Sequence, residues 1–243
     1  MCRQLPPLRS GLHAPAGERE RVRRALLTLS LLTLLPGGAL AGGMDGMAMP
    51  GMPMTHMSMP MTPSATVPGL SQMGLQMQLD MRAMMMPMMN DLARLSGRSF
   101  ERAFMSMMIP HHQGAIDSSR AVLERAKDAQ VRAWATQIIA DQTREIAQMQ
   151  AQLRAYGGPN AAMMARMVQM NQMMDMPAMI RASSMPERTF LEGMIPHHAA
   201  ANDKSTLALQ RTQDPFVLDL AARIITAQAG EMHDFQEWLR AHP

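Results

Sequence analysis

The sequence predicts an all-α fold in which two tandem helical hairpins pack into a four-helix bundle behind a disordered, methionine-rich tail. Three observations support this prediction. One helical unit is written twice, apolar residues recur at helical spacing from about residue 70, and the segment before that is rich in glycine and proline. No stretch of the chain has the alternating pattern of a β-strand.

Residues 1–41 are expected to be a secretory signal peptide. Three arginines within residues 21–24 precede a short apolar run, Ala25–Leu35, and the segment ends in Ala-Leu-Ala at Ala41. This order matches the regions of a signal peptide, and the run is too short for a comfortable membrane span. Export to the periplasm, the cell envelope or the exterior follows, with no stable membrane span after cleavage. A later translation start and an uncleaved N-terminal anchor stay open as alternatives.

After cleavage, the chain would carry neither a strong net charge nor a cysteine. Residues 1–41 hold six arginines and two glutamates, so 17 basic and 18 acidic side chains remain, for a net charge of −1. This balance gives no basis for a nucleic-acid partner. The single cysteine, Cys2, lies in the removed segment, which excludes disulfides, thiolate ligands and c-type haem attachment.

Methionine is the outlying residue type, with 32 in the chain. Residues 42–69 are predicted to be disordered, because prolines and glycines interrupt any regular helix or strand. The methionines of this tail therefore have no core to fill, and they are interpreted as an auxiliary metal site. Its members are Met44, Met47, Met49, Met52, Met54, His56, Met57, Met59 and Met61.

The internal repeat appears when the sequence is shifted by 86 residues. Phe104–His112 then falls on Phe190–His198, both segments end in Met-Ile-Pro-His-His, and the register persists without a gap to the triplets ending at Ala155 and Ala241. A register held so far indicates a duplication. It divides the chain into repeat 1 (70–158) and repeat 2 (159–243).

Each repeat is expected to contain a methionine-rich stretch that is partly helical, followed by a helical hairpin. The methionine-rich stretches are Met73–Met89 and Met163–Met185. The four hairpin helices are expected at Ser99–Lys127, Asp128–Tyr156, Pro186–Arg211 and Asp214–Ala241. Pro110 and Pro196 should either kink their helices or begin new ones.

The histidine pairs fall on the apolar faces of their helices. At about 100° per residue, His111 and His112 share a face with Phe104 and Met108, and the second repeat places His197 and His198 in the same way. On the following helix, a Gln and a Glu lie within an isoleucine stripe: Gln142 and Glu145 in repeat 1, Gln228 and Glu231 in repeat 2.

Two interpretations of these inward residues compete. An inward histidine is often a satisfied core residue, a methionine at helical spacing is often filler, and an inward glutamate can simply bond a histidine. Paired, repeated histidines with a methionine one turn earlier and a facing Gln-x-x-Glu favour a metal site instead. Thioethers are soft ligands that favour Cu(I), while imidazole binds Cu(I) and Cu(II), so copper is the predicted metal.

The paired helices with Met-Ile-Pro-His-His and a downstream Gln-x-x-Glu resemble the ferritin-like family known as domain of unknown function 305, over roughly residues 99–241. The resemblance implies an exported bacterial protein that binds copper and contributes to copper resistance. It also implies a set of metal ligands: Met108, His111, His112, Glu145, Met149, Met194, His197, His198 and Glu231. Met149 is matched by Phe235, so the second repeat lacks one sulfur and is expected to be the weaker site.

The sequence thus predicts a non-enzymatic copper-binding protein for sequestration, trafficking or resistance, with copper ions and other extracytoplasmic copper proteins as its partners. It predicts no oligomeric state. A ferritin-like di-metal oxidoreductase is the first alternative, but that chemistry uses Glu-x-x-His on two helices and no such motif occurs here. The second is a structural or partner-binding bundle in which the methionines form a flexible apolar surface or an oxidant sink.

Overall fold

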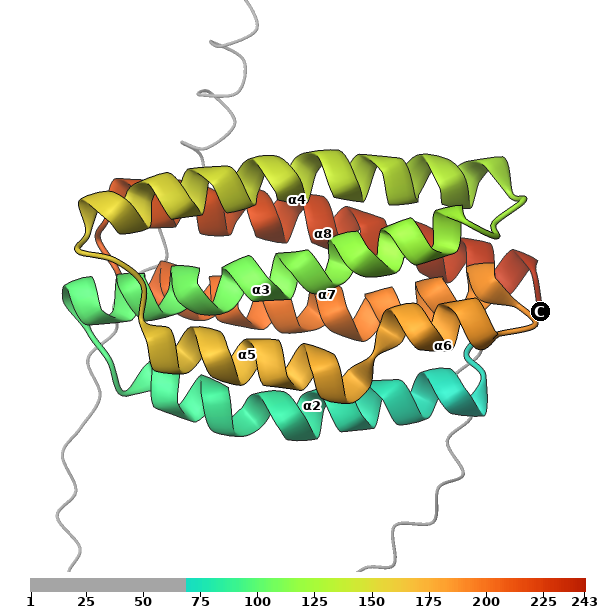
Figure 1. Cartoon of the computed structure of the whole chain (residues 1–243), viewed down its shortest axis with the longest axis horizontal. Helices are drawn as coiled ribbons and strands as arrows, with labels where there is room; N and C mark the ends of the chain where they lie inside the picture. The colour runs from blue at the N-terminus through green and yellow to red at the C-terminus, as the bar shows by residue number, and fades with distance from the viewer. Residues whose placement is uncertain (1–68) are drawn as a thin grey trace, which may run out of the picture. The chain divides into compact units, whose positions relative to one another are not determined.

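The computed structural model describes residues 69–243, which are helical apart from short connections (Figure 1). The helices of this part are α2 (Gln72–Ala93), α3 (Gly97–Leu123), α4 (Ala129–Ala155), α5 (Ala161–Met174), α6 (Met176–Ala182), α7 (Pro186–Arg211) and α8 (Pro215–Ala241). The predicted signal peptide and the methionines and His56 of the predicted tail lie outside the described residues. The all-α prediction is confirmed.

Two long hairpins, α3–α4 and α7–α8, correspond to the two copies of the repeat. Their second helices begin in the same way: Asp128 accepts a hydrogen bond from the Val131 amide at 2.9 Å, and Asp214 accepts one from the Val217 amide at 3.0 Å. A carboxylate at this position satisfies an amide that has no partner within its own helix. The duplicated sequence therefore produces duplicated local structure, as predicted.

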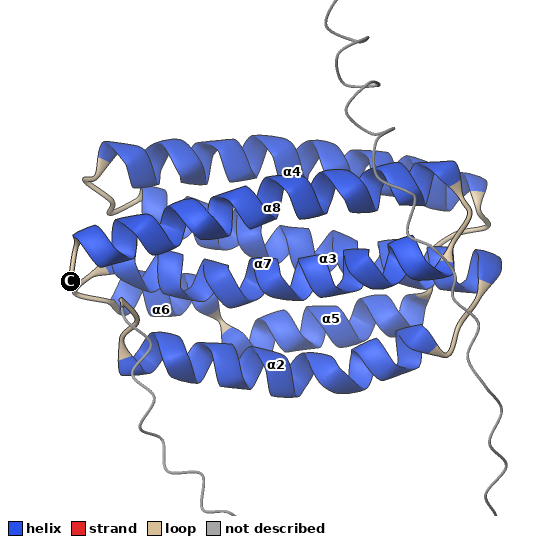
Figure 2. Cartoon of the chain, turned by 180° about the vertical axis from the view of Figure 1, so that it is seen from behind, coloured by secondary structure: helices blue, strands red, loops and turns tan. Residues whose placement is uncertain are grey.

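The helices form three layers, seen from opposite sides in Figures 1 and 2. Helices α3 and α7 lie in the middle, α4 and α8 cover one side, and α2 and α5 cover the other, with α6 continuing from α5. Because α3 and α7 are covered on both sides, residues all around them are buried; Met105, Met107 and Met108 are all fully inaccessible. The two histidine motifs lie on these middle helices.

The methionine-rich stretches form the third layer. In α2, Met77, Met81, Met85 and Met88 recur at helical spacing and are buried. The stretch Met163–Met185 was expected to be only partly helical, and it forms two helices rather than one. The break is at Asp175, which has a positive φ of 27° and caps α6 by accepting a hydrogen bond from the Ala178 amide.

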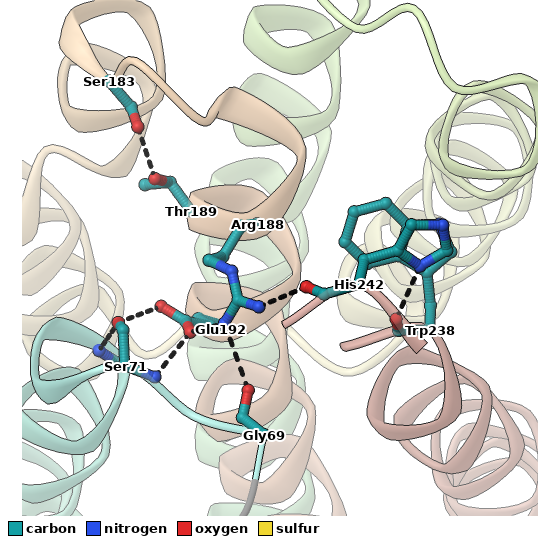
Figure 3. A network of polar contacts seen from close by, with 9 residues as sticks. Gly69, Ser71, Ser183, Arg188, Thr189, Glu192, Trp238 and His242 are labelled. Atoms are coloured by element: carbon teal, nitrogen blue, oxygen red, sulfur yellow. Dashed lines mark hydrogen bonds and ion pairs between the residues drawn. The ribbon is translucent and has the colours of Figure 1, made fainter. Parts of the chain in front are cut away.

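Equivalent positions of the two repeats attach this layer to the middle helices. Glu192 of α7 accepts hydrogen bonds from the amide and hydroxyl of Ser71 at 2.8 and 2.5 Å, just before α2 begins. The equivalent residue of α3, Ser106, accepts a hydrogen bond from the Asn160 amide at 2.8 Å, just before α5 begins. Figure 3 shows the Glu192 network, in which Arg188 bonds Glu192, the Gly69 carbonyl and the His242 carbonyl.

The structure corrects both ends of the first predicted hairpin helix. The first hairpin helix begins at Gly97 rather than Ser99, and it ends at Leu123 rather than Lys127, because the chain turns before Asp128 caps α4. Both Pro110 and Pro196 lie inside continuous helices, so neither begins a new one. Among residues 69–243, no helix combines the length and apolar character needed to cross a membrane.

Candidate metal centre

The two Met-Ile-Pro-His-His motifs meet at the centre of the molecule. Helices α3 and α7 run antiparallel in the middle layer, so the repeat brings His111 opposite His197, with ring centroids 3.8 Å apart and planes inclined by 35°. His111, His112 and His198 are fully inaccessible, and His197 is 8% exposed. We call these four residues the histidine cluster. The sequence predicted that the pairs point inward, and it left open whether they form one site or two; they form one cluster.

The outer histidine of each pair lies against the predicted glutamate, and His112 forms a hydrogen bond with it. His112 Nε2 lies 2.8 Å from Glu145 Oε2, and His198 Nε2 lies 2.7 Å from Glu231 Oε2. These contacts confirm that each motif faces the Gln-x-x-Glu of the following helix. A carboxylate on one ring nitrogen fixes the ring orientation and raises its basicity, which is how ligating histidines are commonly held.

The inner histidines have no partner. Neither ring nitrogen of His111 or His197 has a hydrogen-bond partner among the described residues. Burial lowers the pKa of both rings well below the ordinary value of 6.5, and the neighbouring imidazoles and Lys204 lower each pKa further, while the backbone of His111 acts in the opposite direction on the pKa of His197. Burial also lowers the pKa of His112, against the opposing effect of Glu145. The rings of His111 and His197 are therefore neutral near pH 7 and carry lone pairs that nothing in the described structure uses.

The predicted methionine ligands are buried in the same core. Met108 and Met194 each lie one helical turn before a histidine of the cluster and are 0% and 2% exposed, and Met149 of α4 is fully buried. In the second repeat, Phe235 occupies the position of Met149, and its ring lies 5.8 Å from that of His198 and edge-on to Trp134. The two halves of the centre thus differ chemically, with a thioether in one and an aromatic ring in the other.

A cleft between α4 and α8 leads toward the glutamates. It has a volume of about 780 Å³, and its lining includes Gln142, Glu145, Gln228 and Glu231. Both glutamine side chains are 3% exposed, and their Oε1 atoms have no hydrogen-bond partner within residues 69–243. Buried amide oxygens are usually hydrogen-bonded, so this cleft offers two free oxygen ligands next to two carboxylates.

Lys204 is a residue of this region that the sequence analysis missed. It is fully buried on α7, its Nζ has no partner in the described part of the chain, and burial lowers its pKa from 10.5 to about 7. The equivalent residue in the first repeat is Ser118. A signal was available in the sequence: Lys204 follows His197 and Ala201 at helical spacing, on the face that points inward.

Within residues 69–243, no three histidine, carboxylate or thiolate groups converge in a geometry that would hold a metal ion. Complete coordination from these groups alone is therefore absent from the described part. The histidine cluster and the neighbouring methionines offer imidazole and thioether donors. These donors suit soft monovalent copper, whereas iron and magnesium are typically held in hard, oxygen-rich coordination.

Comparison with known proteins identifies relatives of the same size as the two-hairpin unit. Residues 41–153 and 104–239 each match the sequence profile of the family described as Domain of unknown function (DUF305). The Cu(II)-bound form of CopM is 29% identical, covers 58% of this chain and 97% of that chain, and has a TM-score of 0.51. The Cu(I)-bound form is 27% identical over 58% of this chain and 96% of that chain, with a TM-score of 0.49.

Two further relatives carry no named function. A DUF305 fragment from Deinococcus radiodurans is 29% identical, covers 57% of this chain and 94% of that chain, and has a TM-score of 0.49. An uncharacterized protein of Acanthamoeba polyphaga mimivirus is 38% identical over 53 residues, which are 22% of this chain. The match spans 35% of the length of that curated relative.

Proposed function

The chain belongs to the DUF305 family, and we propose on this premise that it is an exported copper-binding protein that sequesters or carries copper outside the cytoplasm. The observation that carries the proposal is the close, buried pair of rings of His111 and His197, whose four nitrogens have no partner among residues 69–243. Leaving a buried polar group unpaired costs about 1–3 kcal/mol, so such an arrangement suggests a role other than stability.

Copper fits the donors around these rings. The low pKa of His111 and His197 keeps them neutral, and a neutral imidazole is the form that binds a metal. Met108 and Met194 add thioethers at one turn's distance, which favours Cu(I). The similarity to a protein solved with Cu(II) supports copper as the metal, and imidazole accepts both oxidation states.

The glutamates and glutamines have supporting roles in the proposed centre. Glu145 and Glu231 orient His112 and His198 through the close contacts already described. Their carboxylates also line the cleft between α4 and α8, together with Asp141, Arg144 and Arg223, so that negative charge is in slight excess there and favours the approach of a cation. Copper is the cargo of the protein in this proposal, and no catalytic step is assigned to it. Export rests on the signal-peptide pattern of residues 1–41.

Titration with Cu(I) against a chromogenic chelator tests the proposal. We expect the complete exported chain to compete with the chelator for the metal. The His111→Leu/His197→Leu variant should lose the tightest class of site, because it lacks the four free nitrogens and has an apolar side chain in each position. Any copper held by the methionines of residues 42–69 should remain.

A matched control replaces a histidine outside the cluster. His233 is exposed and pairs only with surface carboxylates, so His233→Ala should leave the titration unchanged. Equal affinities for the wild-type protein and the His111→Leu/His197→Leu variant would contradict the proposal. Iron in the purified protein, with oxygen-dependent absorbance changes, would favour the di-metal oxidoreductase instead.

A further inference from the structure

Five methionines surround one surface groove on the side of the molecule opposite the α4/α8 cleft. The groove has a volume of about 320 Å³ and lies where α2 meets α5 and α6, helices that lie along the same side of the bundle in Figures 1 and 2. We call it the methionine groove, and its methionines are Met77, Met84, Met173, Met174 and Met179.

These methionines are not explained by packing alone. A core methionine fills space, but Met173 is 70% exposed and therefore fills none. Ala83 lines the same groove with a side chain too small to close it. The thioether of Met173 consequently borders open volume.

The charge of the groove favours a cation. Among residues 69–243, Asp80 is the only charged residue that lines it, and no arginine or lysine does so. Thioethers are neutral and polarisable, so they bind soft metal ions such as Cu(I) and contribute little to hard ones. Ag(I) is a soft monovalent ion with the same preference and without redox chemistry.

Met174 connects the groove to the histidine cluster. Besides the methionine groove, it lines a second cavity of about 490 Å³, together with three other methionines and His197. The other three are Met81, Met170 and Met176. His197 is the one member of the cluster with measurable exposure. The two cavities therefore place thioethers between the exposed Met173 and the buried ring of His197, whose nitrogens have no partner among the described residues.

We propose that the methionine groove is a second binding site, for a soft monovalent cation, and that the cation reaches His197 through the cavity shared by Met174. The binding site stands on the groove itself, while the transfer to His197 rests on the proposed function of the histidine cluster. On this view the acidic α4/α8 cleft and the methionine groove approach the cluster from opposite sides, one with oxygen ligands and the other with sulfur.

Methyl NMR of the complete exported chain, labelled with ¹³C at the methionine methyl groups, tests the binding site directly. Ag(I) is added in a chloride-free buffer, and signals are assigned with single Met→Leu variants. We expect the methyl signals of Met173, Met174 and Met179 to shift with the first equivalents added. They should shift also in the His111→Leu/His197→Leu variant, which lacks the histidine site.

Substitution of the groove tests its contribution to uptake. Met173→Leu/Met174→Leu/Met179→Leu preserves side-chain volume and removes three sulfurs. We expect it to bind about one Ag(I) equivalent fewer and to load the histidine cluster several-fold more slowly. The matched control is Met73→Leu/Met86→Leu/Met185→Leu, which removes three exposed sulfurs outside the groove.

The outcomes separate the two proposals. Unshifted groove methyl signals, or an equal loss of Ag(I) in the groove variant and its control, would overturn the second site. Shifted groove signals with no loss of metal in the His111→Leu/His197→Leu variant would preserve the groove and overturn the histidine centre. If the groove variant lost one Ag(I) equivalent but loaded the histidine cluster at an unchanged rate, the proposed transfer to His197 would be overturned.

Discussion

At the scale of single residues, the centre of this protein holds polar groups that a stability-optimised core would not contain. His111, His197 and Lys204 are buried without hydrogen-bond partners in the described structure. Buried polar groups without partners are rare in folded proteins and cost free energy. Two predictions follow from the particular residues involved.

Replacing the inner histidines should stabilise the metal-free protein. His111→Leu/His197→Leu removes four unpaired nitrogens from an apolar environment, so we expect the free energy of unfolding to rise by roughly 1–3 kcal/mol, since the desolvation penalty disappears. Urea denaturation in the presence of a metal chelator measures it. A lower free energy of unfolding would mean that these rings make stabilising contacts, and it would weaken the case for a functional site.

Lys204→Met should stabilise the protein in a manner that depends on pH. The pKa of Lys204 is lowered to about 7 in the folded state, whereas the unfolded chain keeps the ordinary value of 10.5. Between these values the unfolded state binds more protons, so the stability of the wild-type protein rises with pH from about 7 to 10.5. Near pH 8 the variant should be more stable by roughly 3 kcal/mol, and the difference should vanish above pH 10.5.

Thermal or urea unfolding of both proteins across this range measures the effect. Lys127→Met, in the turn between α3 and α4, is the control, because that side chain is not buried. A constant difference between wild-type and Lys204→Met at all pH values would show that the ammonium group is paired or hydrated in solution.

At the scale of secondary-structure elements, the two hairpins are alike and the attachment of the third layer differs. Ser106 holds the beginning of α5 with one neutral hydrogen bond, while the equivalent Glu192 holds the beginning of α2 with a charged network. Glu192 is 1% exposed, and its partner Arg188 is largely buried. Removing one member of a buried ion pair leaves the other charge uncompensated.

Glu192→Ala should therefore release α2 before the rest of the molecule unfolds. We expect a loss of about 3 kcal/mol and faster amide hydrogen exchange in Gln72–Ala93, because the anchor of that helix is removed. Hydrogen exchange by mass spectrometry measures the effect. Glu237→Ala removes a surface partner of Arg240 and should cost at most about 1 kcal/mol. Equal effects of the two substitutions would contradict the anchoring role of Glu192.

At the scale of the whole molecule, both the stability of the fold and the binding of metal should decrease as the pH falls. Burial lowers the folded-state pKa of His111, His112 and His197 below 6.5. As pH falls below 6.5, these histidines become protonated in the unfolded chain before they do so in the folded protein, so the unfolded state binds more protons and stability falls. A metal bound only to the folded state adds stability and opposes this loss.

We expect the midpoint of thermal unfolding to fall as the pH drops below 6.5. Ag(I) or Cu(I) should raise this midpoint, and the increase should be smaller at low pH because protons compete for the imidazoles. Calorimetry with and without metal measures both effects. The His111→Leu/His197→Leu variant should show a weaker fall with acid and a smaller increase with metal. If metal raised the unfolding midpoint of that variant as much as it raises that of the wild-type protein, the stabilising site would lie elsewhere.

The sequence by itself determined the helices, the duplication and the inward direction of the histidines. These features are local or periodic: Asp128 and Asp214 cap their helices wherever those helices pack, and a residue three or four positions from Phe104 shares its face in any α-helix. The same periodicity placed Glu145 and Glu231 opposite His112 and His198, because a hairpin with a short turn has only one arrangement of its apolar faces.

Only the tertiary structure decided how the two hairpins meet. The contact of His111 with His197, the burial of Lys204 and the third layer formed by α2, α5 and α6 depend on the packing of segments far apart in the chain. Periodicity within one helix carries no information about the helix that it faces. For that reason the sequence predicted two histidine pairs and many methionines, and packing determined that the pairs form one cluster with a methionine-lined approach.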